Sequence, residues 1–546
     1  MKKEKITIIP IGGLGSFGMN LMFLGYGDDW IIIDAGIGFP DESIVGVDMQ
    51  IPDLDVVGEY RDRVKGIVIT HAHEDHIGSL PYIYNVCPTP VYAPPFVSAL
   101  LKHKANYYEL PMPKVNLIGP GTIVKFGAIS VTWIPVTHSI PDTYGLIIKT
   151  PAGTIVHSGD FKLDNEPLDG RVTDVKAFTK AGDEGVLALM SDSTNAEVPG
   201  HSRSEKSLVK KLTKIVSEAP GRVLITMFAS NVFRLALLGK IAEATDRRLA
   251  LVGTSLETYM NAAQSAGFRI PMAETLDARR LEAFPDRKVL AVVTGSQGER
   301  NAALPRASRR EHDFLNIHPG DTIIMSSRMI PGNEKAIYRV INNLIAQGAK
   351  VLYQGNADVH VSGHAKQDEL TEMIRMTRPK VMIPIHGEMP FMFANKKLAD
   401  AEGVPMSLIM RSGNVIELDQ DGTAEIVDTI PLDENYVDGP VIGTFEEVKI
   451  TEKRRVGWRG VLALQVNVKR AKKGLVSTVA LDSYAVYTDN GKLIEKAEKY
   501  LEKEINSLPK DSHYNLIQDA IRSRLRRFFK QNIGKKPEIL LFLEVS

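Results

Sequence analysis

Short apolar runs rich in β-branched residues recur along the first two hundred residues, and most of them end at Gly, Pro, Asp or His. This pattern predicts strands at residues 6–10, 30–34, 66–70, 91–93, 129–136, 145–150, 154–158 and 186–191. Several of these strands end in or beside a polar residue, namely Asp34, His71, His138, Asp160 and Asp192. When many strands deliver polar side chains at their ends, the usual cause is a site along one edge of a sheet.

The pattern changes near Ser204, where apolar positions begin to follow a helical period. Helices are predicted at residues 205–218, 232–245, 256–266 and 333–347, and strands at 223–227, 249–252, 289–294, 322–325 and 350–353. Alternating strands and helices are typical of a parallel α/β domain. The next predicted strand, residues 381–385, runs into His386 and is similar to the strands of the first region. We therefore expect one domain that is interrupted by an inserted α/β domain.

The last part of the chain predicts a linker followed by a small α+β domain. The linker segment is rich in Pro, Gly and Asp. Behind it, strands are predicted at 460–468, 478–487 and 538–545, and helices at 492–506 and 514–530. The expected organisation is an interrupted domain at 1–204 and 356–430, an inserted domain at 205–355, a linker at 431–449 and a C-terminal domain at 450–546.

Composition narrows the kind of site that the chain can build. Lys plus Arg and Asp plus Glu both number 66, so a nucleic-acid partner would need a local basic surface rather than a net positive charge. Cys87 is the single cysteine, which excludes an internal disulfide and a thiolate zinc site. No apolar stretch predicts a signal peptide or a membrane span, so we expect a cytoplasmic protein without a membrane partner.

Residues 70–76, Thr-His-Ala-His-Glu-Asp-His, are the most informative segment. They place four candidate ligands directly after an apolar strand: His71, His73, Asp75 and His76. Imidazole and carboxylate groups are ligands that zinc and manganese accept. One short turn can direct the first two side chains to one ion and the last two to a second ion. The alternative is a solvated polar loop, which the density of ligands disfavours.

Three further candidates follow later strands, and they complete the ligands for two ions. They are His138, Asp160 and His386, each of which is a weak signal alone. The first ion would take His71, His73, His138 and Asp160, and the second would take Asp75, His76, Asp160 and His386. Two ions about 3.5–4 Å apart can stabilise both the attacking and the leaving oxygen of a phosphoryl displacement.

The histidine-rich motif with these later residues resembles the metallo-β-lactamase fold. The inserted domain, the Asp-Ser-Thr-Asn segment at 192–195, His364 and His386 resemble the β-CASP nucleases, which act on RNA or DNA. More specifically, segments at 12–15, 33–36, 137–142, 228–231, 294–299 and 384–388 resemble the bacterial ribonuclease J family. The resemblance covers about residues 6–430. It implies an α/β fold, a metallo-β-lactamase αββα sandwich interrupted by a β-CASP domain, with a small α+β C-terminal domain.

The resemblance also implies an activity and its residues. It implies a metal-dependent 5′→3′ exoribonuclease, with endoribonuclease activity as well, that acts on single-stranded RNA in processing and decay. Each subunit would hold two divalent ions, Zn²⁺ first and Mn²⁺ or Mg²⁺ as alternatives. The catalytic residues would be Asp75 and His76 at the metals, Asp192 as their support, and His364 at the scissile phosphate. Homodimers or homotetramers and RNA-decay partners belong to the same expectation.

A pocket for a nucleotide phosphate is implied as well. Its residues would be Ser230, Asn231, His360, Val361, Ser362, Gly363 and His364. Hydroxyls, imidazoles and backbone N–H groups at a glycine turn suit a phosphate anion. A pocket that accepts a 5′-monophosphate and excludes a triphosphate would make the chemistry of the RNA end a control point.

Two other functions stay open at this point. One is a metal-dependent phosphodiesterase of the same fold that acts on DNA or on small phosphodiesters, and the other is an inactive RNA-binding subunit. The complete ligand set argues against the inactive subunit. The basic residues Arg454, Arg455, Lys469, Arg470, Lys472 and Lys473 fit an RNA contact, a solvated face or a subunit contact equally well. Asp48 and Asp438 are a minor candidate pair for a separate hard cation.

Overall fold

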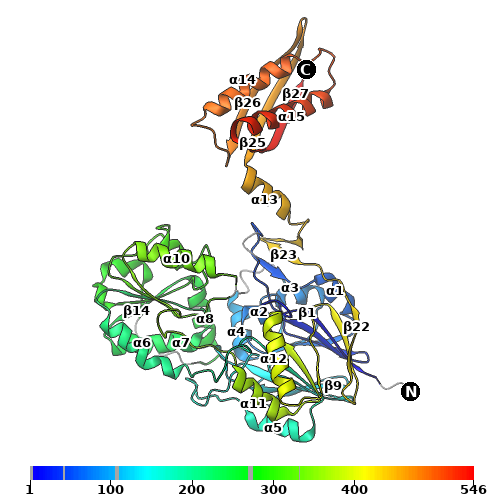
Figure 1. Cartoon of the computed structure of the whole chain (residues 1–546), viewed down its shortest axis with the longest axis vertical. Helices are drawn as coiled ribbons and strands as arrows, with labels where there is room; N and C mark the ends of the chain where they lie inside the picture. Colours follow the sequence, from blue (N-terminus) through cyan, green and yellow to red (C-terminus); the bar gives the residue numbers. More distant parts are fainter. Residues whose placement is uncertain (1–3, 41–43, 105–109, 269–274, 331) are drawn as a thin grey trace. The chain divides into compact units, whose positions relative to one another are not determined.

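The structure is a computed structural model that describes residues 4–40, 44–104, 110–268, 275–330 and 332–546. The chain forms two compact units (Figure 1). The larger unit comprises residues 1–39 and 51–434, and the smaller unit comprises residues 40–50 and 435–546. None of the helices in the described ranges is long and apolar enough to cross a membrane.

Two large sheets form the centre of the larger unit. The first has the strand order β22 (Ala424–Thr429), β21 (Asn414–Leu418), β1 (Ile6–Gly12), β2 (Leu21–Tyr26), β3 (Asp29–Ile33), β5 (Val64–Val68), β6 (Val91–Ala93) and β7 (Val115–Leu117). The second has the order β20 (Met406–Ser407), β19 (Val381–Ile385), β12 (Ala188–Asp192), β11 (Gly153–His157), β10 (Tyr144–Thr150), β9 (Ile129–Pro135) and β8 (Ile123–Phe126).

The two sheets pack face to face, and the alternation of side chains along β9 shows how. Ile129, Val131 and Trp133 are buried in the layer that the sheets share, whereas Ile134 packs on the outer face. The indole N–H of Trp133 donates to the Ile69 carbonyl at 3.1 Å, which satisfies its polar atom inside this layer.

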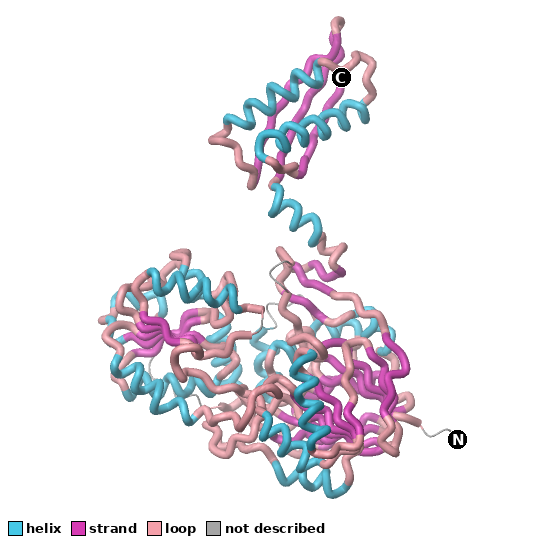
Figure 2. Tube along the Cα trace, in the orientation of Figure 1, coloured by secondary structure: helices cyan, strands magenta, loops and turns pink. Residues whose placement is uncertain are grey.

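Helices cover the outer faces of both sheets. The first sheet is covered by α1 (Leu54–Tyr60), α2 (Glu74–Ile77), α3 (Leu80–Val86) and α4 (Pro95–Lys104). The second is covered by α5 (Val175–Glu184), α11 (Gln367–Thr377) and α12 (Met389–Ala401). The order helix, sheet, sheet, helix (Figure 2) confirms the expected αββα sandwich.

An α/β segment is inserted between two neighbouring strands of the second sheet. Ala188 of β12 pairs in parallel with Val381 of β19, so the chain leaves the sheet and returns beside its point of exit. In between lies a parallel sheet of β15 (Thr275–Leu276), β14 (Arg248–Val252), β16 (Val289–Val293), β13 (Val223–Thr226), β17 (Thr322–Met325) and β18 (Lys350–Leu352). Its helices are α6 (Lys206–Glu218), α7 (Val232–Ala244), α8 (Thr254–Ser265), α9 (Ala303–Ser308) and α10 (Glu334–Ala346), with short 3₁₀ turns η2 (Ala278–Ala283) and η3 (Asp286–Lys288). The inserted α/β domain is thus confirmed.

The smaller unit ends in a three-stranded sheet covered by two helices on one face. Its strands are β26 (Gly474–Tyr484), β25 (Val461–Ala471) and β27 (Glu538–Val545), and β25 pairs antiparallel with β26 and parallel with β27. The helices α14 (Lys492–Asn506) and α15 (Tyr514–Ile533) bury their apolar faces against this sheet. The α+β architecture predicted for the end of the chain is therefore present, and α13 (Ile450–Arg459) precedes it.

Residues 431–449 differ from the expected linker. They contain β23 (Asn435–Asp438) and β24 (Val441–Thr444), which form a sheet with β4 (Met49–Ile51) in the order β24-β23-β4. Tyr436 is buried there with Val448 and Ile450. The physical reason is that the Asp-Gly-Pro segment forms the turn of a hairpin, with Gly439 at a φ of 57°, so turn residues mimic the composition of a linker.

Candidate metal centre

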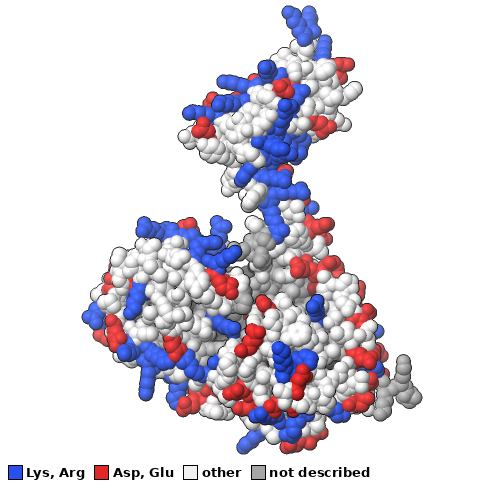
Figure 3. All heavy atoms as spheres, in the orientation of Figure 1, with Lys and Arg blue, Asp and Glu red and all other residues white. Residues whose placement is uncertain are grey.

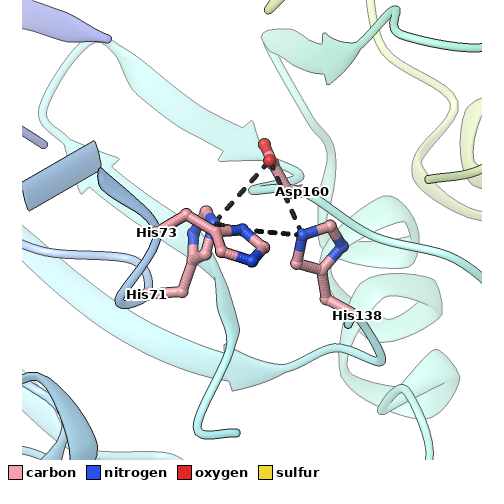
Figure 4. A group of neighbouring side chains, drawn as sticks. All are labelled: His71, His73, His138 and Asp160. Atoms are coloured by element: carbon pink, nitrogen blue, oxygen red, sulfur yellow. Dashed lines mark hydrogen bonds and ion pairs between the residues drawn. The ribbon is translucent and has the colours of Figure 1, made fainter. Parts of the chain in front are cut away.

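Four predicted ligands meet where strands of the two large sheets end. His71 and His73 follow β5, His138 follows β9, and Asp160 follows β11. Their ligand atoms all lie within 4.8 Å of one another (Figure 4). His71, His138 and Asp160 are buried, and His73 is partly buried.

The ring nitrogens of the three histidines point toward one another. His73 Nδ1 lies 3.0 Å from His71 Nε2 and 3.1 Å from His138 Nε2. Only one proton can occupy His73 Nδ1, so hydrogen bonds among the rings satisfy these converging nitrogens poorly. A divalent cation would satisfy them together with the Asp160 carboxylate, because imidazole nitrogens and carboxylate oxygens are both zinc ligands. The donor set therefore fits a divalent metal ion.

A second group lies beside the first and shares Asp160 with it. The ligand atoms of Asp75, His76 and His386 again lie within 4.8 Å of one another. Asp160 Oδ2 is 3.7 Å from His71 Nε2, 3.4 Å from His76 Nε2 and 3.5 Å from His386 Nε2. All seven residues expected as metal ligands thus lie together, with Asp160 between the two groups.

The ring nitrogens that face away from the centre are held by neighbours. His76 Nδ1 donates to Asp34 Oδ2 at 2.8 Å. His71 Nδ1 lies 3.0 Å from the Thr70 hydroxyl, which itself donates to Asp34 Oδ2 at 2.8 Å. His138 Nδ1 donates to the Gly363 carbonyl at 2.8 Å. In a ring that binds a metal ion, such a partner at Nδ1 fixes the tautomer in which Nε2 carries the lone pair toward the centre.

Electrostatics divides the histidines into two kinds. Burial lowers the pKa of His71 and His138 well below 6.5 and that of His73 to about 4, so these rings are neutral. Burial also opposes a charge on His76, but the carboxylates around it, led by that of Asp160, raise its pKa to about 10. The same balance raises the pKa of His386. The carboxylates of Asp75 and Asp160 thus stabilise positive charge beside His76 and His386, and a divalent cation would supply such a charge.

Asp192 and His364 lie at the edge of the two groups. His364 Nδ1 donates to Asp192 Oδ2 at 2.8 Å and is 4.0 Å from Asp160 Oδ2. Asp192 Oδ1 accepts from the Thr194 hydroxyl at 2.7 Å, and that hydroxyl lies 2.9 Å from His386 Nδ1. Asp192 therefore positions His364 directly and His386 through Thr194.

The residues expected to bind a nucleotide phosphate continue from this pair. Ser362 Oγ accepts from Asn195 Nδ2 at 2.9 Å and from the backbone N–H of His364 at 3.1 Å. A Cβ atom at Gly363 would lie 2.9 Å from the His138 ring, so a larger residue would displace that ring. The side chain of Val361 is buried in the core beside the inserted sheet, so only the backbone of Val361 can take part.

Asn231 and Ser230 begin helix α7 of the inserted segment. Asn231 Oδ1 accepts from the backbone N–H of Arg234 at 2.9 Å, and its Nδ2 lies 3.4 Å from Glu205 Oε1. The side chain of Asn231 thus caps the helix. Ser230 is partly buried directly before it.

Asn20 is a site neighbour that the sequence pattern does not reveal. Its Nδ2 donates to the Asp75 carbonyl at 2.9 Å and lies 3.2 Å from His76 Nε2. It is in the loop between β1 and β2, where no motif marks it. Only the folded chain brings it to the metal loop.

The pair considered for a separate cation is already compensated inside the smaller unit. Asp438 pairs with the Lys453 ammonium, and Asp48 Oδ2 accepts from the backbone N–H of Gly439 at 2.9 Å. The Lys453 ammonium thus already neutralises Asp438, where a separate metal cation would have to bind.

Family models match four parts of the chain. Residues 220–344 match the model described as "Ribonuclease J, beta-CASP domain", and residues 448–544 match "Ribonuclease J C-terminal domain". Residues 29–179 match "Beta-lactamase superfamily domain". Residues 349–408 match "Zn-dependent metallo-hydrolase RNA specificity domain".

Curated relatives match almost the whole chain. The ribonuclease J of Sinorhizobium meliloti is 37% identical, with 99% of this chain and 97% of the relative covered. That of Thermus thermophilus is 36% identical, with coverages of 98% and 95%. A solved structure from Enterococcus faecalis, described as a protein of unknown function, shares the fold at a TM-score of 0.55 and 19% identity, covering 76% of this chain and 100% of its own. On the full-length relatives, this protein belongs to the ribonuclease J family.

Proposed function

We propose that this protein is a metal-dependent ribonuclease that removes nucleotides from RNA in the 5′→3′ direction and also cleaves RNA internally. The observation that carries the proposal is the convergence of seven ligands on two adjoining groups that share Asp160. RNA is favoured over DNA because the relatives are named ribonucleases and the segment at 349–408 matches an RNA specificity domain.

The protein's own residues would orient the metals and the phosphate. His71, His73, His138 and Asp160 would hold one ion, and Asp75, His76, His386 and Asp160 the other, with Zn²⁺ first and Mn²⁺ or Mg²⁺ as alternatives. When bound, two such ions supply an activated water at neutral pH and neutralise phosphate charge. His364 is anchored through Nδ1 on Asp192, so in the protonated form of the ring its Nε2–H can donate to a phosphate oxygen or to the leaving oxygen.

A cavity beside the first metal group suits a nucleotide. Its volume is about 520 Å³, and its lining includes Thr137, His138, Lys162, Glu205 and Phe233. Small-molecule sites are typically about 300–1,000 Å³. The cavity thus has room for a nucleotide beside His138, a candidate ligand of the first ion.

Metal removal with product analysis tests the proposal. The protein is dialysed against a chelator, resupplied with Zn²⁺, Mn²⁺ or Mg²⁺, and given labelled RNA with a 5′-monophosphate or a 5′-triphosphate, or DNA of the same sequence. We expect no cleavage without metal, and mononucleotide release that is fastest from 5′-monophosphate RNA. Metal-independent cleavage, or a preference for DNA, would refute the proposal. Equal cleavage rates on 5′-monophosphate RNA and 5′-triphosphate RNA would refute the proposal that a pocket selects the 5′-monophosphate.

We further propose that the smaller unit mediates a homodimer or homotetramer. The helices α14 and α15 cover one face of its sheet, whereas Val476, Leu540 and Phe542 are exposed at 53%, 56% and 69% on the described surface. An apolar sheet face of this kind is typical of a protein interface. Lys and Arg side chains gather over α13 to α15 (Figure 3), which leaves RNA contact as a second use of this unit. Arg470 is already engaged, since it donates to the Lys510 and Ser512 carbonyls.

A further inference from the structure

The proposed phosphate pocket contains no lysine or arginine, and its His364 is already paired with Asp192 at 2.8 Å. Ser230, Asn231, Val361, Ser362 and Gly363 are uncharged. Burial, followed by the charges of nearby cations, holds the pKa of His360 well below its usual value, so this ring is neutral at pH 7. A terminal phosphate monoester carries a charge of about −1.5 to −2 at this pH. A lysine or arginine that pairs with this phosphate must therefore come from another part of the chain.

Three cations act electrostatically on His360, and two of them are already neutralised. They are Arg234, Arg328 and Lys162. Arg234 is buried and pairs with Glu205, with its Nε 3.1 Å from Glu205 Oε2. Lys162 is buried and lies 3.1 Å from Asp164 Oδ2. Arg234 could pair with a bound phosphate only by giving up its ion pair with Glu205, and Lys162 only by giving up Asp164.

Arg328 differs from both in its partners. It lies in the loop after β17, and the only acceptor for its guanidinium among the described residues is the amide oxygen of Asn195. It forms no ion pair with a residue that the structure describes, although it is partly buried. Burial lowers its pKa, with Glu197 opposing at longer range. A desolvated guanidinium with one neutral acceptor is costly unless an anion joins it.

The position of Arg328 is fixed beside the pocket. Asn195 accepts from Arg328 and donates to Ser362 Oγ at 2.9 Å and to the His364 carbonyl at 3.0 Å. The loop itself is held by Gln297, whose side chain donates to the Arg328 carbonyl at 2.8 Å and accepts from the Ile330 N–H at 2.8 Å. Asn195 therefore links the Arg328 guanidinium to Ser362 of the pocket, and Gln297 holds the loop that carries Arg328.

We propose that Arg328 is the substrate-binding cation that pairs with the 5′-terminal phosphate of RNA and so sets the preference for 5′-monophosphate ends. This inference rests on the proposed ribonuclease function. A planar guanidinium binds a phosphate through paired hydrogen bonds, which suits a terminal phosphate with three free oxygens better than a 5′-hydroxyl.

The test compares Arg328→Gln and Arg328→Lys with the unchanged protein on two RNAs of one sequence, one with a 5′-monophosphate and one with a 5′-hydroxyl. We expect Arg328→Gln to raise KM for the monophosphate RNA by about tenfold or more while kcat changes little, because a charge-assisted hydrogen bond is lost. KM for the hydroxyl RNA should stay unchanged, and Arg328→Lys should restore part of the affinity. Arg339→Gln, on the exposed surface of α10, removes the same charge and is the matched control.

The outcomes separate this inference from the function on which it rests. If the unchanged protein does not cleave RNA, the proposed function fails. If it cleaves with a preference for 5′-monophosphate ends and Arg328→Gln keeps that preference, only the role of Arg328 is refuted. Equal losses on both RNAs would also overturn it, because they would indicate a general disturbance through Asn195. Thermal melting of each variant shows whether the fold is retained.

Discussion

Both ring nitrogens of His76 lie close to carboxylates of the site. Its Nδ1 is held by Asp34, and its Nε2 lies among Asp75, Asp160 and Asn20. Asp34 accepts from both His76 and Thr70 with its backbone at a φ of +60°, a conformation that a non-glycine residue rarely adopts. Strain of this kind is typically kept where the surrounding contacts require it, here around the metal loop.

At this scale we predict that His76→Ala abolishes RNA cleavage while the fold is retained. The loss of activity should exceed the roughly 10–100-fold that is typical when only an outer-shell partner of a metal ligand is removed. Cleavage of labelled RNA and circular dichroism are the measurements. His103→Ala, at an exposed position of α4, is the control and should keep full activity. Undiminished cleavage by His76→Ala would refute the site assignment.

At the scale of elements, the inserted segment is held together by buried charge pairs as well as by its apolar cores. Arg222 precedes β13 and Asp321 precedes β17, and both side chains are 1% exposed. Arg222 donates to Asp321 through Nε at 3.0 Å and Nη2 at 2.7 Å. The pair joins the starts of two neighbouring strands, β13 and β17.

We predict that Asp321→Ala destabilises the inserted segment strongly. A buried guanidinium that loses its carboxylate typically costs about 3–5 kcal/mol. Calorimetry should show a lower melting transition, and limited proteolysis should cut within the inserted segment. Lys288→Ala is the control, because Lys288 and Asp246 are an exposed pair, and such pairs contribute about 0–1 kcal/mol. Equal effects of the two substitutions would contradict the argument.

At the scale of the whole molecule, the candidate metal ligands and the proposed surface for self-association lie in different units. All seven candidate ligands belong to the larger unit, whereas the exposed apolar sheet face belongs to the smaller one. Along β27 the alternation is regular: Ile539, Leu541 and Leu543 pack toward α14 and α15, and Leu540 and Phe542 point to the other side. A face that is apolar without an internal partner favours association.

We predict that deleting the chain after Asp433 weakens self-association, and that Leu540→Glu with Phe542→Glu has the same effect in the full chain. Charges on this face would be buried without partners in the oligomer. Sedimentation velocity measures the mass in solution. An unchanged mass in both variants would refute the proposed interface, and the double variant keeps the test valid if the truncated chain folds poorly.

The sequence by itself indicated the seven candidate ligands and the alternation of strands and helices, and its family resemblance implied the αββα fold. The ligands stand at strand ends, and the strands and their side-chain period are local properties of the chain. Local pattern also predicted β9, β12, β19, α14 and α15. It missed α13 and the helices that cover the two large sheets, among them α5, α11 and α12, whose apolar faces need the second sheet to be recognised. It misread 431–449 because hairpin turns and linkers share one composition.

Only the tertiary structure decided which residues surround those ligands. Asn20 reaches Asp75 across 55 positions, and Asn195 reaches Ser362 across 167. No local period encodes such contacts, because they depend on how two sheets and an inserted segment pack together. The same packing separates Arg234, which has a carboxylate partner, from Arg328, which has none among the described residues. Residue types and strand ends can be read from the local sequence. Which charged groups of a site have a partner depends on contacts between segments that are distant in the sequence.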